Sequence, residues 1–296
     1  EYNLSAALRQ SWLEPVFSLA FYLPMAVIGI PPAVYVAALT VNTLYQFWVH
    51  NRSVKTLGPL EWVLNTPSHH RVHHGIDPEY IDKNYGGMFV VWDRLFGTFQ
   101  REKREPYYGT VKPLASFSAF YANAFEFMRI ASLIEGSTTL REKLYAPFAP
   151  PEWRPAAMGG VAPVPEVNPR TYARYDTRVS REVDAYAVTQ FALVALASTG
   201  LLWFHGDLSL MATLASGAWI MLGIASVGAL IEGRELGRIS EYARWFAFPG
   251  IALLLAREAH LPLRARTTVL VLGAVTAFMV ERWMSRVTDG MRATVV

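Results

Sequence analysis

Long uncharged stretches alternate with polar ones along this chain. From Pro15 to Val49, 35 residues pass without a charged side chain. One helix of that length would measure about 52 Å, well beyond the ~30 Å hydrocarbon core of a bilayer. Pro31 and Pro32 near its middle break the helix, because proline lacks a backbone donor and clashes with the preceding turn. We predict a helical hairpin, roughly 12–30 and 33–50, with both ends on the same side of a membrane. Each arm is short for a span, so a shallow or tilted hairpin is an alternative.

The C-terminal part is apolar again. Residues 185–206 and 208–231 are uncharged stretches long enough to span a bilayer. Two shorter apolar segments follow, at 245–256 and 267–280, and they reach only about 18–21 Å as helices. They are either re-entrant or spans whose flanking arginines extend to the membrane surface.

These patterns predict an all-α fold, an integral membrane helical protein with a cytoplasmic histidine-box cap. We expect residues 1–135 to form one part, with the membrane hairpin at 12–50, a polar His-box region at 51–115 and an interfacial helix at 117–134. A Pro-rich linker over 136–184 and a membrane-helix tail over 185–296 complete the chain.

Composition supports a membrane protein. Hydrophobic residues make up 52% of the chain and charged residues only 17%, whereas a soluble domain carries about 25% charged residues. The absence of cysteine excludes disulfide scaffolds, iron–sulfur clusters, Cys-ligated zinc and thiol nucleophiles. The net charge of +3 comes from basic residues that flank apolar runs, a membrane pattern that does not indicate nucleic acid as a partner.

The distribution of basic residues predicts an orientation. Lys and Arg are frequent in 51–115 and 135–184 and absent from the 205–207 turn. Because short cytoplasmic segments carry the excess of Lys and Arg, we expect the polar region to face the cytoplasm.

Histidines gather in the polar region. Five of the seven lie within 25 residues, namely His50, His69, His70, His73 and His74. A Pro-Ser pair at 67–68 predicts the start of a short helix and Gly75 its end. On that helix His70, His73 and His74 share a face, since residues three and four apart are neighbours. The alternative is a solvated His-rich turn or stacked rings that merely pack.

The cluster points to metal binding. Imidazole suits zinc, copper, iron and nickel, so the ligand type alone does not name the metal. A His-only cluster this dense suggests two ions, with His50 joining from the membrane boundary. The two remaining histidines, His205 and His260, are expected to be surface residues.

At these residues the chain resembles the fatty acid hydroxylase/sterol desaturase superfamily of membrane di-iron oxygenases, and within it the alkylglycerol monooxygenase branch. The matching stretches are Glu1 to Ser5, Leu44 to His50, Leu57 to Glu61, Asn65 to Gly75, Ile81 to Gly87 and Trp92 to Phe99. The resemblance covers residues 1–115 closely and the tail only loosely.

The resemblance implies O2-dependent oxidation of a lipid C–H bond at a di-iron centre. It assigns as metal ligands His50, His69, His70, His73 and His74. Gln46 stands where many relatives carry a further histidine. Candidates for hydrogen bonding behind the ligands are Gln46, Asp82, Asn84, Tyr85, Trp92 and Asp93, for which purely structural roles are equally open.

The lipid substrate would enter from the bilayer, and the electron donor is open. The alkylglycerol resemblance implies a reduced pterin as donor and attack beside an ether oxygen, releasing an aldehyde and a glycerol. A sterol or fatty-acyl substrate and another external donor are alternatives.

The family pattern starts with two histidine boxes placed just before the stretch at which this chain begins. We therefore expect this chain alone to be inactive and a longer native form to be the enzyme. Two other classes are a zinc-dependent membrane hydrolase and a non-catalytic metal- or lipid-binding membrane protein. The hydrolase lacks support from an HExxH or G-x-S-x-G motif.

Overall fold

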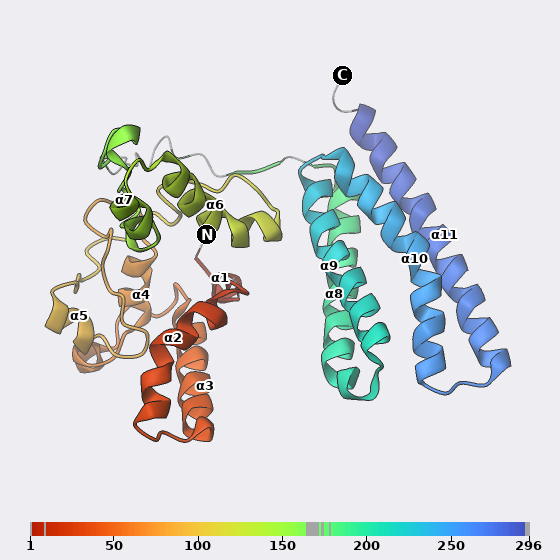
Figure 1. The fold of residues 1–296 in the computed structure, drawn as a ribbon, viewed down its shortest axis with the longest axis horizontal. Helices are drawn as coiled ribbons and strands as arrows, with labels where there is room; N and C mark the ends of the chain where they lie inside the picture. The colour runs from red at the N-terminus through yellow and green to blue at the C-terminus, as the bar shows by residue number, and fades with distance from the viewer. Residues whose placement is uncertain (1, 9, 164–171, 173–174, 178, 294–296) are drawn as a thin grey trace. The chain divides into compact units, whose positions relative to one another are not determined.

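The computed structural model describes the whole chain except residues 1, 9, 164–171, 173–174, 178 and 294–296. The described residues form helices and loops with two isolated β-bridges and no strand, so the predicted all-α class is confirmed (Figure 1). They divide into two compact units, residues 1–114 with 125–174 and residues 115–124 with 175–296. Part of the predicted Pro-rich linker, 164–171 and 173–174, lies outside the described residues.

The first unit begins with a short helix and a helical hairpin. α1 (Leu4–Ala7) precedes α2 (Glu14–Val27) and α3 (Pro32–Val49). Between the long helices Gly29 adopts a positive φ of 83°, which glycine tolerates because it lacks a Cβ. Pro32 then opens α3, where its missing N–H leaves no helical bond unmade.

The region after the hairpin is mostly irregular. It contains η1 (Gly58–Trp62), α4 (Pro67–His73) and α5 (Val91–Phe96). α4 starts at the predicted Pro-Ser pair, and its reciprocal cap joins Thr66 and His69. α6 (Ala119–Gly136) and α7 (Leu140–Tyr145) follow, then two short 3₁₀ turns, η2 (Ala146–Phe148) and η3 (Ala156–Met158).

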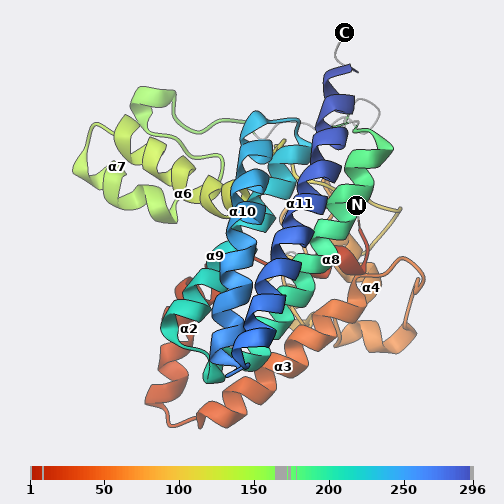
Figure 2. The same cartoon turned by 90° about the vertical axis from the view of Figure 1, so that its right-hand side faces the viewer.

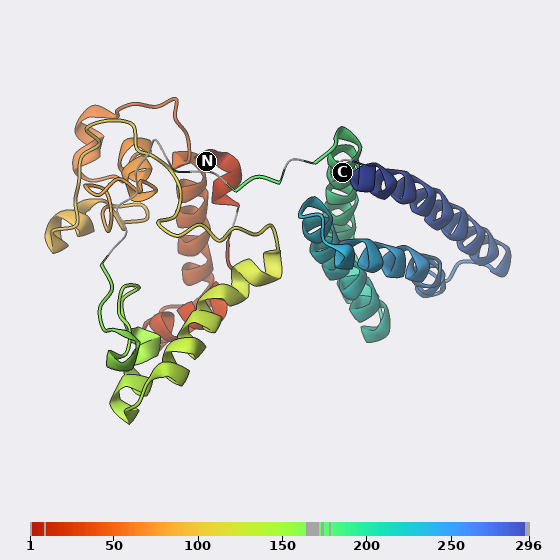
Figure 3. The same cartoon turned by 90° about the horizontal axis from the view of Figure 1, so that it is seen from above.

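The second unit is built around four long helices. They are α8 (Arg181–Phe204), α9 (Leu210–Ile231), α10 (Glu235–Glu258) and α11 (Leu263–Ala293), with the turn η4 (His205–Asp207) between the first two. α9 packs against both α8 and α10, and α10 packs against α11 (Figures 2 and 3). Three described segments are long and apolar enough to cross a membrane, namely Arg181–Asp207, Leu210–Ile231 and Leu263–Arg286.

The two short apolar segments of the tail belong to long continuous helices, α10 and α11, and the second of them lies within the candidate span Leu263–Arg286. In α10 the charged residues that precede the apolar segment, Glu241 and Arg244, are fully buried. The Glu241 carboxylate accepts hydrogen bonds from the Arg244 guanidinium at 2.8 and 2.7 Å, and also from the hydroxyls of Tyr186 and Ser226. A charge inside apolar packing needs such partners, because an unpaired one would be very costly.

Candidate metal centre

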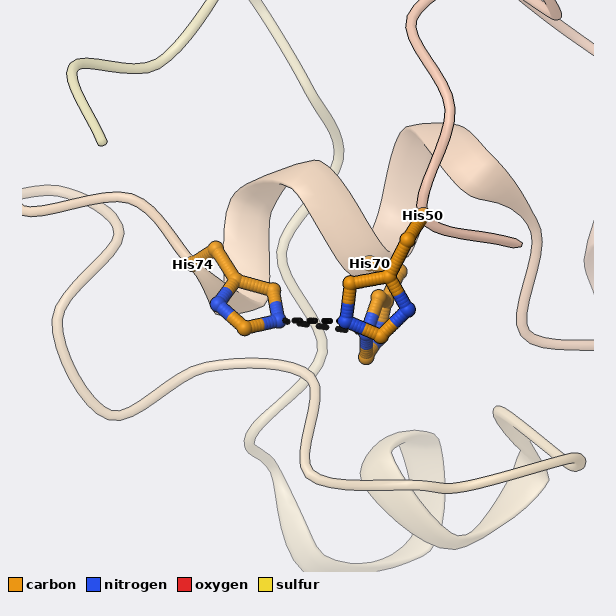
Figure 4. Close-up of side chains that lie close together, drawn as sticks. All are labelled: His50, His70 and His74. Carbon is orange, nitrogen blue, oxygen red and sulfur yellow. Dashed lines mark hydrogen bonds between the residues drawn. The ribbon is translucent and has the colours of Figure 1, made fainter. Parts of the chain in front are cut away.

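Three imidazoles point their Nε2 atoms at one another (Figure 4). The distances are 3.1 Å between His70 and His50, 3.2 Å between His50 and His74, and 3.2 Å between His74 and His70. These three form the one group of potential metal ligands that satisfies the spacing of a shared ion among the described residues. We call His50, His70 and His74 the histidine triad.

Two helices bring the triad together. His50 is the first residue after α3, and His70 lies in α4 one turn before His74, the C-cap of that helix. The i,i+4 spacing places these two rings on one face of α4, as the sequence predicts.

The tautomer of His50 follows from its partner. Its Nδ1 lies 2.6 Å from the carbonyl oxygen of Gln46, which can only accept a hydrogen bond. Nδ1 therefore carries the proton, and Nε2 offers its lone pair toward His70 and His74. The backbone of Gln46, rather than its side chain, thus orients the ring.

The triad is electrostatically suited to a cation. Burial, reinforced by the neighbouring imidazoles, holds the pKa of His70 well below its usual value. Burial and the repulsion from His73 and His50 lower the pKa of His74 to about 3, and burial lowers the pKa of His50 as well. The rings are therefore neutral at neutral pH, the form that binds metal.

The spacing fits a single ion. Nitrogens about 2.0–2.1 Å from one ion, at tetrahedral or octahedral angles, stand about 2.8–3.4 Å apart. The triad spacing of 3.1–3.2 Å lies within that interval. An ion between the rings would bind the Nε2 lone pair that each neutral imidazole can offer there.

The other two clustered histidines lie outside the triad. His69 is buried at the start of α4, where its Nδ1 accepts a hydrogen bond from the Thr66 N–H at 3.4 Å. His73 stacks on His70 with ring centroids 5.4 Å apart, and its Nδ1 faces the Lys83 carbonyl at 3.3 Å. Both remain predicted ligands.

Two of the six candidates for supporting roles organise the loops around α4. The amide of Asn84 donates to the carbonyl oxygen of His69 at 3.1 Å and to that of Gln100 at 2.7 Å. The Asp93 carboxylate accepts from the N–H groups of Tyr85 and Gly86 at 2.7 and 2.8 Å. These contacts reach the backbone of the site rather than its imidazoles.

The remaining candidates lie farther out. The hydroxyl of Tyr85 donates to exposed Asp82 at 2.7 Å, and the Tyr85 ring meets His73 edge-on at 5.9 Å. Trp92 is 56% exposed. Gln46 packs against Gly87, where a Cβ would meet its amide at 3.1 Å.

Two residues that support the triad were not predicted from the sequence. Buried Tyr2 stacks on His50 with centroids 5.5 Å apart, and its hydroxyl donates to the Val49 carbonyl at 2.8 Å. Buried Arg71 forms an ion pair with Glu102. Both contacts join residues more than 30 positions apart in the chain, so no local sequence pattern predicts them.

Fold and site together define a helical membrane protein with a candidate histidine metal centre. Residues 1–98 match the family model described as fatty acid hydroxylase, whose members are generally iron-dependent. The N-terminal part of the chain therefore carries a fatty acid hydroxylase domain, as the resemblance of its motifs predicts.

Named relatives agree with that assignment. The chain is 39% identical over 242 residues to alkylglycerol monooxygenase of Danio rerio, covering 79% of this chain and 52% of the relative. It is 37% identical over 263 residues to alkylglycerol monooxygenase of Homo sapiens, covering 88% of this chain and 58% of the relative. An ornithine lipid hydroxylase of Rhizobium tropici is 30% identical over 97 residues, 32% of this chain and 29% of the relative. No solved structure matches the chain.

The alkylglycerol monooxygenase alignments extend well beyond the family model into the second unit. The chain spans about half the length of these curated relatives.

Proposed function

We propose that this chain is part of a membrane lipid oxygenase and that the histidine triad holds iron in it. The observation that carries the proposal is the convergence of three neutral Nε2 atoms at 3.1–3.2 Å in the segment that matches the fatty acid hydroxylase model. Iron bound there would supply the activation of O2 for oxidation of a lipid C–H bond.

Residues of this chain hold the three imidazoles of the triad in place and orient them toward the proposed iron. His50 is fixed by its bond to the Gln46 carbonyl, and α4 fixes His70 and His74 at one spacing. Burial of His50 and His70 keeps both rings neutral and limits their contact with water. Tyr2 covers one side of His50 with its ring, which restricts the imidazole to the orientation observed.

The proposed centre contains two irons, as the family resemblance implies. His73 stacks on His70, so its ring lies directly beside the triad, where it could bind a second iron. His69 and His73 are the further ligands that we propose from this chain. His69 would have to give up its bond to the N-cap of α4 in order to bind.

The proposed substrate is a lipid drawn from the bilayer, and an ether lipid is favoured by the similarity to alkylglycerol monooxygenases. Attack at the carbon beside the ether oxygen would release an aldehyde and a glycerol, with O2 as co-substrate and a reduced pterin as electron donor. The His-box region is proposed to face the cytoplasm, because basic residues are concentrated on that side of the predicted spans.

Measuring the iron bound per chain tests whether the histidine triad is a metal centre. We would purify the 296-residue chain in mild detergent, load it anaerobically with Fe(II), and measure bound iron in the original chain and in His74→Ala. Iron should bind to the original chain and fall in the variant, while His205→Ala, an exposed histidine of the second unit, serves as the matched control. Zinc binding without iron would favour the hydrolase, and equal binding in all three proteins would contradict the triad.

Activity is measured separately, in a chain as long as the relatives. Consumption of O2 that depends on an alkylglycerol and a reduced pterin is the expected result. Metal binding without any lipid-dependent O2 consumption would favour a non-catalytic binding protein.

A further inference from the structure

The second unit contains a cavity that the metal centre does not involve. It measures about 540 Å³, within the 300–1,000 Å³ typical of small-molecule sites, and lies among α8, α9 and α10. Its walls are apolar and include Ala197, Gly200, Leu201, Ile220, Ile251 and Leu255. The family model ends at residue 98, far before these helices.

The cavity has a floor and a mouth. Trp219 and Phe248 close the inner end, with ring centroids 5.6 Å apart. Asp207 and Glu258 line the other end, where the α8–α9 and α10–α11 turns lie at the same end of the helices (Figure 1). Ser209 ties these turns together by donating from its hydroxyl to Glu258 at 2.7 Å.

The depth of the cavity suits one lipid chain. Phe248 and Glu258 are ten residues apart on α10, a separation of about 15 Å along a helix. That length is half of the ~30 Å hydrocarbon core, the part that one leaflet contributes. Two of the three lining helices, α8 and α9, are apolar enough to cross a membrane, so a lipid chain could reach this site from the bilayer.

Polar groups along the cavity indicate the head group. Ser216 is among the residues that line the cavity, and its hydroxyl oxygen is buried without a hydrogen-bond partner in the described part of the chain. The carboxylates of Asp207 and Glu258 can accept from hydroxyl groups. Arg257, Arg264 and Arg266 lie at the same end of the helices but are not among the residues that line the cavity, so the charged groups in its lining are the two carboxylates.

We propose that this cavity binds the hydrocarbon chain of a single-chain neutral lipid, with the hydroxyls of its head group at Asp207 and Glu258. A monoacylglycerol has this chemistry. Binding requires neither the histidine triad nor O2, so the site goes beyond the proposed oxidation and its test is independent of it.

Tryptophan fluorescence provides the measurement. A monoacylglycerol with bromine atoms in its chain quenches a tryptophan that it touches, and Trp219 forms the cavity floor. We would titrate this lipid into the purified full chain in a non-ionic detergent. A saturable quenching component should appear and should disappear in Trp219→Phe, which separates it from quenching of the other eight tryptophans.

Two glycine variants locate the site. A Cβ at Gly200 meets nothing within 4 Å, so Gly200→Leu fills the cavity without a clash in its first atom. Gly250→Leu is the matched control, because Gly250 is also helical and open, and it is not among the residues that line the cavity. We expect Gly200→Leu to weaken binding by about tenfold or more, because its added side chain would occupy space that the lipid chain needs. Gly250→Leu should bind as the original chain does.

The head group is tested with a second probe. A brominated alkyl phosphate of the same chain length should bind more weakly, because the carboxylates at the mouth repel an anion. Unchanged quenching in Gly200→Leu, equal loss in Gly250→Leu, or tighter binding of the phosphate would each overturn the proposal.

Discussion

The guanidinium of Arg71 and the carboxylate of Glu102 form a two-point ion pair, with Nε–Oε1 at 2.8 Å and Nη2–Oε2 at 2.6 Å. The remaining nitrogen of Arg71, Nη1, donates to the carbonyls of Asn51 and Val54 at 3.2 and 2.8 Å. Because Arg71 follows His70 and Asn51 follows His50, this side chain joins the two segments that carry the triad.

Replacing Arg71 by Lys should therefore loosen the metal site. A lysine ammonium cannot reproduce the planar fork that satisfies a carboxylate and two carbonyls together. We expect the affinity for Co(II), a coloured stand-in for iron, to fall by about tenfold, a typical effect of losing support behind metal ligands. The absorption of the cobalt complex measures it.

Arg52→Lys is the control for that substitution. Arg52 pairs with Glu105, but both side chains are exposed, and exposed pairs contribute little. A cobalt affinity that falls equally in both variants would contradict the role given to Arg71.

Tyr2 supports the triad through its ring and its hydroxyl separately. Tyr2→Phe removes the bond to the Val49 carbonyl and should lower the free energy of unfolding by only about 1 kcal/mol. Tyr2→Ala also removes the ring that stacks on His50 and on Tyr108, leaving a cavity that costs about 3–5 kcal/mol. Thermal unfolding with and without Co(II) distinguishes the two effects. Equal destabilisation by both substitutions would show that the ring contributes nothing.

Asp93 is expected to hold the loop after α4 together. Its carboxylate accepts from the N–H groups of Tyr85 and Gly86 and from the Thr98 hydroxyl at 2.6 Å. In Asp93→Asn the amide nitrogen has no lone pair to offer, so at least one buried donor loses its partner, at a cost of about 1–3 kcal/mol.

Urea unfolding of the first unit would measure this effect. Asp82→Asn is the control for Asp93→Asn, because Asp82 is exposed and makes one side-chain hydrogen bond, with the Tyr85 hydroxyl. Asn also tolerates the positive φ of 56° at that position. If Asp82→Asn destabilised the protein as much as Asp93→Asn, burial of the Asp93 bonds would not be the cause.

The parts of the structure that could be predicted are those set by local chemistry. The break between α2 and α3 follows from two prolines, and the facing of His70 and His74 follows from their i,i+4 spacing. His69 lies in the same motif, yet at the third position of the helix its ring serves the N-cap. The spacing shows which residues share a face, but not which nitrogen already has a partner.

The tail shows where local reasoning fails. Arg244 directly precedes the apolar segment 245–256, and an unpaired charge is very costly inside a bilayer. In the folded chain its guanidinium lies 4.6 Å from the ring centre of Trp219 and pairs with Glu241. The i,i+3 spacing of Glu241 and Arg244 was visible in the sequence. The partners from α8 and α9 that make burial tolerable were not.

That network gives the last prediction. Glu241→Met leaves the Arg244 guanidinium buried without its carboxylate, and Arg244→Met leaves Glu241 with hydroxyl and indole donors alone. Each single substitution should lower the stability of the second unit by about 3–5 kcal/mol. The double substitution removes both charges and retains apolar volume, so it should be less destabilising than either single one. Thermal unfolding in detergent of the original chain and the three variants measures the coupling. Additive effects of the two substitutions would show that the charges do not act as a pair.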